Sequence, residues 1–534
     1  MRARAPAALA TLALAGCLVV GCPAGKPDAA ADAKTLRLNL GTEPETLDWT
    51  RGRDSVSFDV VGCLMDGLTR LDAGGRVEPA LAEGWEFDDA GRRLTFHLRP
   101  GVRWTDGHPL EADQFVAAWR RLLDPTTAAE YAYVLYPIAG ARAFNEGKTR
   151  DPATVGVEAP DARTLVVRFE KPATYFPGLT TFMVTFPIPT WALRAGGDRW
   201  TEPDRIVTLG PFRLARWRHD DRIDLVAWDG YWDGRRALDR VEMVMVEEAS
   251  TAVLLYESGA LDFLDSRSLP PALIPRYSKA PGHASAPQLR SNYLGFNTAK
   301  PPFNDRRARA AFAMALDRSV IPRVLRGGEI PLRSFLPPGL LGYDPAVGLP
   351  FDPERARALL AEAGWPGGRG FPPVELAYNT REDHKTLAEA VQAMWKRELG
   401  VEVVLRNEEW KVFLQSLVVD PPAIYRLGWG ADYPDPHNFM ELFTRASGNN
   451  HTRWGSAEYD ALIDRAAATA APADRVALYT RAQRILLEEA VAIVPTHAGV
   501  MHYVTRPWVH GLAPNPQGVL DLRAVALDPA GARR

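Results

Sequence analysis

The sequence contains little of what marks a disulfide-rich, membrane-spanning or nucleic-acid-binding protein. It has 3 cysteines in 534 residues, and only Cys63 lies outside the N-terminal apolar run. Beyond that run, no stretch approaches the ~20 apolar residues that span a bilayer. The net charge is −3 and arginines alternate with acids, so nothing favours nucleic acid as a partner. Stability must therefore come from an apolar core rather than from disulfides.

Catalytic and metal-binding patterns are also missing. The chain has no Gly-x-Ser-x-Gly elbow, no phosphate-binding loop ending in Gly-Lys-Ser/Thr, and no His-Glu-x-x-His. Its 10 histidines show no metal-type pairing, and His437 and His451 are too loosely spaced to suggest a site. We predict no enzymatic activity, no metal and no cofactor. An exported hydrolase stays open as an alternative, because a catalytic triad need not be local in sequence.

The first 28 residues have the order of an export signal. Arg2 and Arg4 precede an alanine-rich apolar run from residue 5 to about residue 21, and the polar segment 23–28 follows. Positive charge, a short apolar core and small residues in that order are typical of a secretory signal rather than a spanning helix. We therefore predict an exported protein in the cell envelope or periplasmic space.

Two cysteines end small-residue motifs inside this region. Leu14-Ala15-Gly16-Cys17 and Val19-Val20-Gly21-Cys22 both resemble the bacterial lipobox, in which the cysteine is acylated and becomes the new N-terminus. Cys17 has the better leucine three places upstream, whereas Cys22 lies where the apolar run ends. We predict a lipoprotein signal peptide over 1–21, a tether over 22–34, and lipidation at Cys22, with Cys17 as the alternative. Cleavage without a lipid also stays open.

Apolar periodicity divides the rest of the chain into two parts. Up to about residue 290, short alternating strands dominate, such as 94–98 and 164–169. Beyond it, strands at 374–378 and 401–405 enclose a helix that Gly400 ends. Such an arrangement predicts a βαβ unit with parallel strands. The chain is too long for a single core, so we expect several domains with an α/β C-terminal part.

One short stretch carries the strongest signal for a binding site. Residues 426–436 follow a strand-like lead-in and contain Gly428, Trp429, Gly430 and Asp432. The glycines lack a Cβ and let another backbone approach, and the tryptophan offers a flat apolar wall. With the single anion of Asp432, these features predict a site for a ligand with a backbone and a positive charge. The alternative is a strand-to-loop turn in which Asp432 caps the following helix.

Several motifs resemble a known family. Ala82-Glu83-Gly84-Trp85, Val102-Arg103-Trp104-Thr105-Asp106-Gly107 and Ala112-Asp113-Gln114-Phe115-Val116 are similar to the signature of the large bacterial extracellular solute-binding proteins of peptide ABC transporters. Pro302-Phe303-Asn304-Asp305 and the stretch from Gly428 to Asp432 look like the oligopeptide-binding branch of that family. Matching motifs occur along nearly all of the chain after the N-terminal signal.

The resemblance implies an α/β fold: a two-lobed, periplasmic-binding-protein-like clamshell of type II, similar to the large cluster C proteins, with three domains. The lobes would close over a ligand by a hinge motion. The implied division is a discontinuous hinge-side domain I over 35–65, 190–289 and 501–534, a β-rich insertion as domain II over 66–189, and an α/β lobe as domain III over 290–500.

The resemblance also implies a function and a set of binding residues. The protein would be a lipid-anchored, monomeric receptor that binds short peptides by their backbone and termini. It would deliver them to the permease and ATPase of an ABC transporter. Asp432 matches the acid that pairs with the peptide ammonium. The positions that match groups meeting the peptide carboxylate are Arg426, His384 and Arg326, and those that match pocket-wall aromatics are Tyr131, Trp410 and Trp429.

Two positions depart from the oligopeptide pattern. Gly295 stands where an acid often lines a pocket, and Leu417 where an arginine can stand. Fewer fixed charges there hint at tolerance of acidic or apolar side chains. Relatives with the same fold that carry dipeptides, nickel chelates, haem or signalling peptides remain alternatives, although Asp432 favours a ligand bearing an amine.

Overall fold

The computed structural model describes residues 34–72 and 74–528. The predicted signal peptide and the candidate lipidation residues Cys17 and Cys22 lie outside the described residues. Within the described part of the chain, no helix combines the length and the apolar character needed to cross a bilayer. Cys63 is a buried free thiol, and its Sγ donates to the carbonyl oxygen of Asp59 at 3.3 Å.

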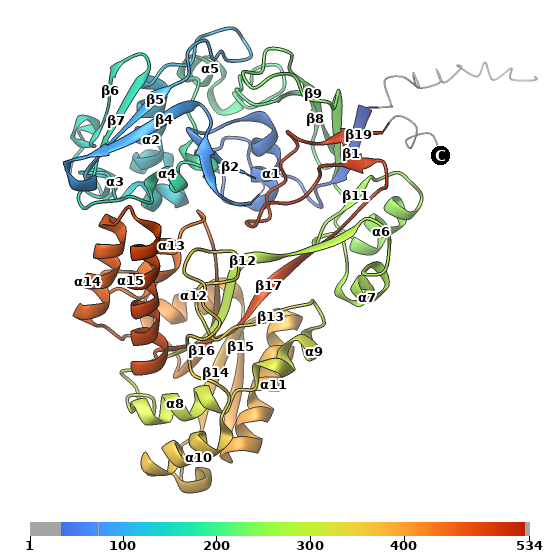
Figure 1. The fold of residues 1–534 in the computed structure, drawn as a ribbon. Helices are drawn as coiled ribbons and strands as arrows, with labels where there is room; N and C mark the ends of the chain where they lie inside the picture. The colour runs from blue at the N-terminus through green and yellow to red at the C-terminus, as the bar shows by residue number, and fades with distance from the viewer. Residues whose placement is uncertain (1–33, 73, 529–534) are drawn as a thin grey trace, which may run out of the picture.

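The upper lobe in Figure 1 holds two four-stranded sheets over one large apolar core. The first has the strand order β1-β10-β9-β8, in which β1 runs parallel to β10 although the two lie far apart in the sequence. The second is antiparallel, has the order β4-β5-β7-β6, and packs against α2. The bounds are β1 Thr35–Asn39, β4 Ala82–Asp88, β5 Arg93–Leu98, α2 Asp113–Leu123, β6 Val157–Asp161, β7 Thr164–Arg168, β8 Phe212–Arg218, β9 Arg222–Ala227 and β10 Arg240–Val244.

The lower lobe is built on a mixed sheet with the order β11-β17-β12-β16-β14-β15, to which β13 adds on β17. Its strands β14 and β15 are parallel and flank the crossover helix α11, so the predicted βαβ unit is confirmed. The second strand begins at Val403, two residues later than predicted. The bounds are β11 Phe263–Leu264, β12 His283–Phe296, β13 Ile330–Pro331, β14 Val374–Asn379, α11 Glu382–Leu399, β15 Val403–Glu408, β16 Ile424–Gly430 and β17 Ile493–Thr505.

Helices cover both faces of the lower sheet. One apolar core joins one face to α8, α10 and α11, and a second core joins the other face to α12, α13, α14 and α15. Residues that alternate along β16 therefore point into different surroundings. The bounds are α8 Arg306–Met314, α10 Pro353–Glu362, α12 Trp410–Val419, α13 His437–Met440, α14 Ala457–Ala468 and α15 Pro472–Arg484.

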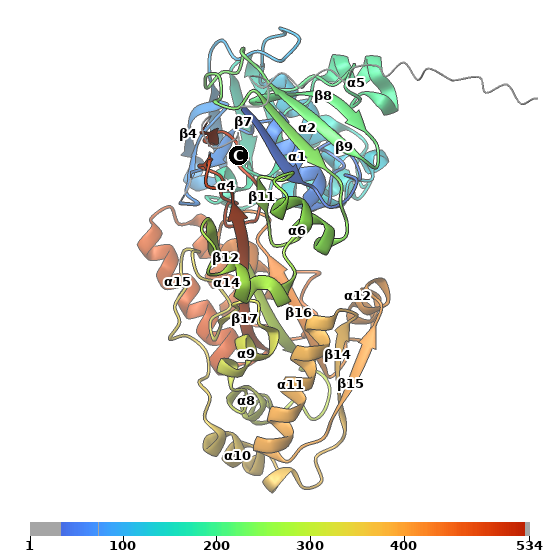
Figure 2. The same ribbon diagram turned by 90° about the vertical axis from the view of Figure 1, so that its right-hand side faces the viewer.

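Two long strands connect the lobes. β12 and β17 pair antiparallel and run from beneath the upper lobe into the middle of the lower sheet (Figure 1, Figure 2). The composition change near residue 290 thus falls inside β12. The pairing of β12 with β17 is interrupted between Pro287 and Ser291 by a shift of register, so Arg290 lies in the interruption.

The lobes also touch beside these strands. The backbone N–H of Thr174 donates to the carbonyl oxygen of Ala467 at 2.9 Å, and Lys171 pairs with Asp464 at 2.8 Å. The ring of Tyr175 stacks on His437 with centroids 3.9 Å apart. The upper lobe therefore rests on the end of the lower lobe that carries α13 and α14.

Candidate functional site

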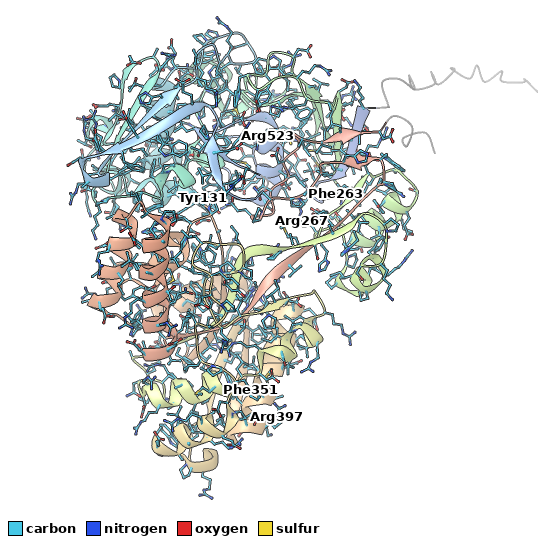
Figure 3. All side chains as sticks on the ribbon, viewed as in Figure 1. Tyr131, Phe263, Arg267, Phe351, Arg397 and Arg523 are labelled. Atoms are coloured by element: carbon cyan, nitrogen blue, oxygen red, sulfur yellow. The ribbon has the colours of Figure 1, made fainter. Side chains whose placement is uncertain are left out.

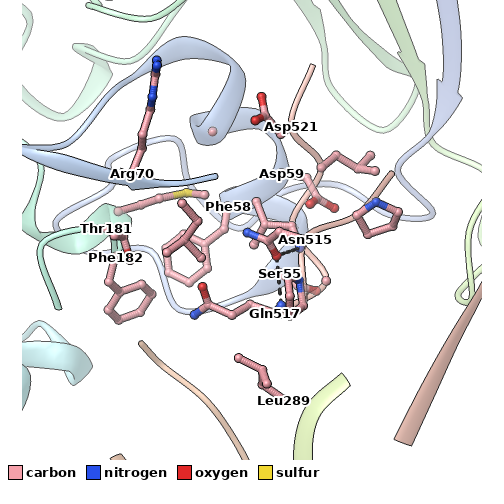
Figure 4. A pocket seen from close by; sticks show the side chains of 18 of the residues that line it. Ser55, Phe58, Asp59, Arg70, Thr181, Phe182, Leu289, Asn515, Gln517 and Asp521 are labelled. Carbon is pink, nitrogen blue, oxygen red and sulfur yellow. Dashed lines mark hydrogen bonds between the residues drawn. The ribbon is translucent and has the colours of Figure 1, made fainter. Parts of the chain in front are cut away.

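A cleft of about 860 Å³ lies between the lobes. Its upper wall comes from α1 (Ser55–Leu64), the segment around Phe182, and the C-terminal segment 511–524. Its lower wall comes from residues 288–290 and 430–432. Figure 4 shows Phe58, Phe182 and Gln517 on the upper wall with Leu289 facing them, and Figure 3 places Tyr131 at the edge of the upper lobe that faces the lower one. Elements far apart in sequence thus form one cavity.

The predicted stretch is the end of strand β16 and the turn that follows. Within it, Arg426, Gly428 and Gly430 share one face of the sheet, whereas Leu427 and Trp429 point to the other face and pack against the second core. A Cβ on Gly428 would lie 2.7 Å from Asn292 Oδ1, and one on Gly430 would lie 3.3 Å from Arg290 Nη2. Side chains of β12, rather than a second backbone, therefore fill the space that the glycines leave.

Asp432 lies just past the strand, at the edge of the cleft. Its Oδ2 accepts from the Tyr133 hydroxyl and from Asn438 Nδ2, each at 3.2 Å. Among the described residues, no cation lies within 4 Å of this carboxylate, and its removal from water raises its pKa. It does not cap the following helix, because the N–H of His437 donates to Asp435 Oδ1 at 2.9 Å instead. The capping alternative is therefore wrong, and Asp432 is an anion without a counter-charge.

Arg426, at the start of the same stretch, is a cation with no carboxylate nearby among the described residues. Its guanidinium is buried, donates to Asn292 Oδ1, and lies 3.4 Å from His384 Nδ1. Within the described part of the chain, no carboxylate approaches it within 4 Å, and its Nε has no hydrogen-bond partner. Burial lowers the pKa of Arg426 to about 9. The buried His384 has its pKa lowered to about 4, first by burial and then by the charge of Arg426, so it is neutral at pH 7.

The other predicted residues divide into two groups. Tyr131 lines the cleft beside Phe182, with ring centroids 4.8 Å apart, and burial together with the charge of Asp432 raises its pKa to about 12. Trp429 is half-buried, and its Nε1 donates to Asn438 Oδ1 at 2.9 Å. Trp410 and Arg326 are exposed, the first at the start of α12 and the second at the end of α9 (Ile321–Leu325). Of the predicted site residues, only Tyr131, Gly430 and Asp432 border the cavity in this conformation. Those that do not border it are Arg426, His384, Gly428, Trp429, Trp410 and Arg326.

At both positions that depart from the oligopeptide pattern, Gly295 and Leu417, buried side chains of the core fill the space. A Cβ on Gly295 would lie 2.2 Å from the ring of Tyr425, its partner on β16. Tyr425 and Leu417 are both fully buried in the second core of the lower lobe. A larger side chain at position 295 would therefore require the Tyr425 ring to move.

Sequence reasoning missed three polar side chains that hold the charged residues in place. Tyr133 reaches Asp432 from the upper lobe, Asn292 accepts from Arg426, and Gln517 Nε2 donates to the carbonyl oxygen of Asp432 at 2.9 Å. None of them has a local signal, because each acts on a residue more than 80 positions away. Only Tyr133, two residues after the predicted Tyr131, could have been found from its neighbour.

Two lobes joined by a pair of long strands, with a cleft between them, define a clamshell solute-binding protein. The family model of the bacterial extracellular solute-binding proteins, family 5 Middle, matches residues 76–451. The chain belongs to this family, and the predicted type II clamshell is confirmed. The proteins it resembles bind substrates and are not enzymes, so the exported hydrolase is no longer needed as an alternative.

The relatives include oligopeptide-binding proteins. The chain is 36% identical over 499 residues to the periplasmic oligopeptide-binding protein OppA of Salmonella typhimurium, covering 90% of both chains. It is 34% identical over 510 residues to the probable deoxycholate-binding periplasmic protein YgiS of Escherichia coli, covering 93% of both. Its structure resembles the unliganded open form of the periplasmic murein tripeptide binding protein MppA with a TM-score of 0.82 and 31% identity, covering 92% of this chain and 97% of the other.

Proposed function

We propose that this protein captures short peptides between its lobes and delivers them to the permease of an ABC transporter. One observation carries the proposal: Asp432 at the edge of the cleft and Arg426 at the start of the same stretch are opposite charges, and among the described residues neither has an oppositely charged group within 4 Å. Unpaired charges removed from water are costly, so a ligand that neutralises both gains from both ends. A free peptide carries an ammonium at its first residue and a carboxylate at its last, so one peptide can supply a partner for each charge.

The spacing of the two charges bears on peptide length. Arg426 and Asp432 are six positions apart in the chain, which corresponds to at most about 20 Å at the rise of an extended strand. An extended peptide advances ~3.3–3.6 Å per residue, and the two side chains reach toward the ligand. Peptides of about three to five residues therefore fit best. The ammonium would bind Asp432, and the carboxylate would bind Arg426 beside the neutral His384.

The three-domain division is part of the proposal. The sheet that contains β1 and β8–β10 supports domain I over 35–65, 190–289 and 501–534, and the sheet that contains β4–β7 supports domain II over 66–189. The mixed sheet and its helices support domain III over 290–500. Bending of β12 and β17 would then close the cleft on a peptide and bring Trp410 and Arg326 toward it. The likeness to an unliganded open form supports an open starting state.

A thermal-shift assay tests the proposal. Peptide should raise the melting temperature of the purified protein, since a ligand at 100 times its Kd stabilises the native state by about 2.7 kcal/mol. We expect a shift with a mixed library of di- to pentapeptides and none with deoxycholate, which has a carboxylate but no ammonium for Asp432. A shift with deoxycholate alone, or none with any peptide, would overturn the assignment. Separate assays with a nickel chelate, with haem and with dipeptides alone test the alternative ligands; a shift with only one of them would assign that ligand instead.

Membrane attachment is a separate proposal. The export signal and the cysteine at its end support lipidation at Cys22, which would hold a monomeric receptor beside its permease. In the producing bacterium, Cys22→Ser should move the protein from the membrane fraction to the soluble fraction, whereas Cys17→Ser should leave it in the membrane. The reverse pattern would assign the lipid to Cys17. Release by neither variant would mean that the anchor is not a lipid on either cysteine.

A further inference from the structure

The charges around the cleft are almost all neutralised by the protein itself. Each of five arginines that line it has a carboxylate within 3 Å. The pairs are Arg53 with Glu45 at 2.6 Å, Arg70 with Glu78 at 2.7 Å, Arg236 with Asp233 at 2.8 Å, Arg267 with Asp59 at 2.7 Å, and Arg523 with Asp521 at 2.8 Å. The upper wall therefore presents fixed ion pairs rather than free charge.

Arg290 is the exception among the described residues that line the cleft. Its side chain is exposed and, among the described residues, has no carboxylate within 4 Å and no hydrogen-bond partner, whereas its backbone pairs with Gly430 on β16. Asp432 is the corresponding exception among the cleft carboxylates. The other seven described acids beside the cleft each have an arginine within 4 Å; two examples are Asp66 with Arg523 at 3.9 Å and Asp72 with Arg76 at 2.8 Å. The cleft thus carries one free anion and one free cation.

The local fold holds Arg290 in place. It lies opposite Gly430 on the neighbouring strand and in the interruption of the pairing between β12 and β17. Its guanidinium approaches Gly430 so closely that a Cβ there would lie 3.3 Å from Nη2 and 3.6 Å from Nε. The glycine therefore makes room for the arginine. Partial removal from water and the charge of Arg381 both lower the pKa of Arg290, although its side chain stays exposed to the solvent in the cleft.

The position of Arg290 indicates which part of a ligand it meets. Arg290 lies opposite Gly430, which precedes Asp432 by two residues. Two residues of an extended chain span about 7 Å. A peptide whose ammonium pairs with Asp432 would have its first or second residue beside Arg290. Its terminal carboxylate would lie farther along the strand, toward Arg426.

We propose that Arg290 is a specificity residue that binds the side-chain carboxylate of an aspartate or glutamate at the first or second position of the peptide. The inference rests on the proposed function, since it takes the ligand to be a peptide held by Asp432. An arginine fork matches a carboxylate with two parallel hydrogen bonds, which neither an amide nor an ammonium can accept. The cleft therefore selects acidic peptides and disfavours basic ones at this position.

Isothermal titration calorimetry with matched peptides tests the role of Arg290. The purified protein should bind Ala-Glu-Ala about tenfold more tightly than Ala-Gln-Ala, and Ala-Lys-Ala more weakly than either. In Arg290→Gln the ratio between the Glu and Gln peptides should fall to about one, while Ala-Gln-Ala keeps its affinity within about twofold. Arg290→Lys should keep part of the preference, because it keeps the charge. Arg53→Gln, which removes a paired cleft arginine, should leave the ratio unchanged.

Further arms separate the possible outcomes. The same peptides with an amidated C-terminus should keep the tenfold ratio; loss of the ratio would mean that Arg290 binds the terminal carboxylate instead. Equal losses for the Glu and Gln peptides in Arg290→Gln would mean that Arg290 serves lobe closure, and an unchanged ratio would remove it from the site. Absence of any binding of all three tripeptides to the unaltered protein would contradict the peptide function itself, and the role of Arg290 with it.

Discussion

Asp432→Asn should weaken the binding of a free tripeptide about 100-fold, because a charged pair in a water-excluding site is worth several kcal/mol. Asparagine keeps the shape of the side chain and an oxygen that can accept from Tyr133 and Asn438. The change therefore removes the charge and little else. The N-acetylated form of the same peptide should bind weakly to the unaltered protein and no more weakly to the variant. Titration calorimetry with both peptides measures the four constants.

Glu441→Gln is the matched control for Asp432→Asn. Glu441 lies in the same segment, and burial together with the charge of Asp432 raises the pKa of Glu441 to about 8, so its carboxyl is largely protonated near pH 7. It has no place in the proposed contact with the ammonium. Glu441→Gln should change the affinity for either peptide by less than about threefold, because an amide replaces a carboxyl group that is largely uncharged near pH 7. Equal losses for the free and acetylated peptides in Asp432→Asn would mean that Asp432 has a structural role.

The residues that could be predicted are those whose signal is local. The stretch from Gly428 to Asp432 could be recognised because two glycines, an aromatic ring and an acid stand together in five residues. The βαβ unit was predictable for the same reason, since a strand, a helix ended by Gly400 and a second strand follow one another directly. Local sequence also shows that the chain changes character near residue 290, where β12 passes from one lobe to the other.

What could not be predicted depends on neighbours across the sheet. The two glycines indicated a close approach but not its partner, which is a side chain of β12 at both positions. Gly295 suggested an open pocket, whereas the Tyr425 ring fills that space. Arg290 gave no signal at all, since an arginine between Leu289 and Ser291 is ordinary until the fold leaves it without a carboxylate. The pairing of strands, not the composition of either one, decides these three cases.

The second prediction with a large expected effect is that replacing Arg426 lowers the affinity for peptide without lowering the stability of the fold. Arg426→Met should weaken a free tripeptide about 100-fold by removing the partner of its carboxylate. The same tripeptide with an amidated C-terminus should lose little affinity, because it has no terminal carboxylate. The unliganded variant should be at least as stable as the unaltered protein in chemical denaturation, because a buried guanidinium with no described carboxylate within 4 Å is costly to the fold. Arg381→Gln, which removes an exposed arginine paired with Asp383 at 2.8 Å, should change neither quantity by much.

A drop in stability with equal loss for the acid and the amide would make Arg426 a structural residue instead. The double variant Asp432→Asn/Arg426→Met then asks whether one peptide touches both charges at once. Losses at sites about 20 Å apart should add, so a tri- to pentapeptide should lose close to the sum of the two single effects. A dipeptide is too short to reach both groups, so the double variant should lose no more than the worse single variant. If the two losses add only for peptides above a certain length, the distance between Arg426 and Asp432 determines which peptide length the protein prefers.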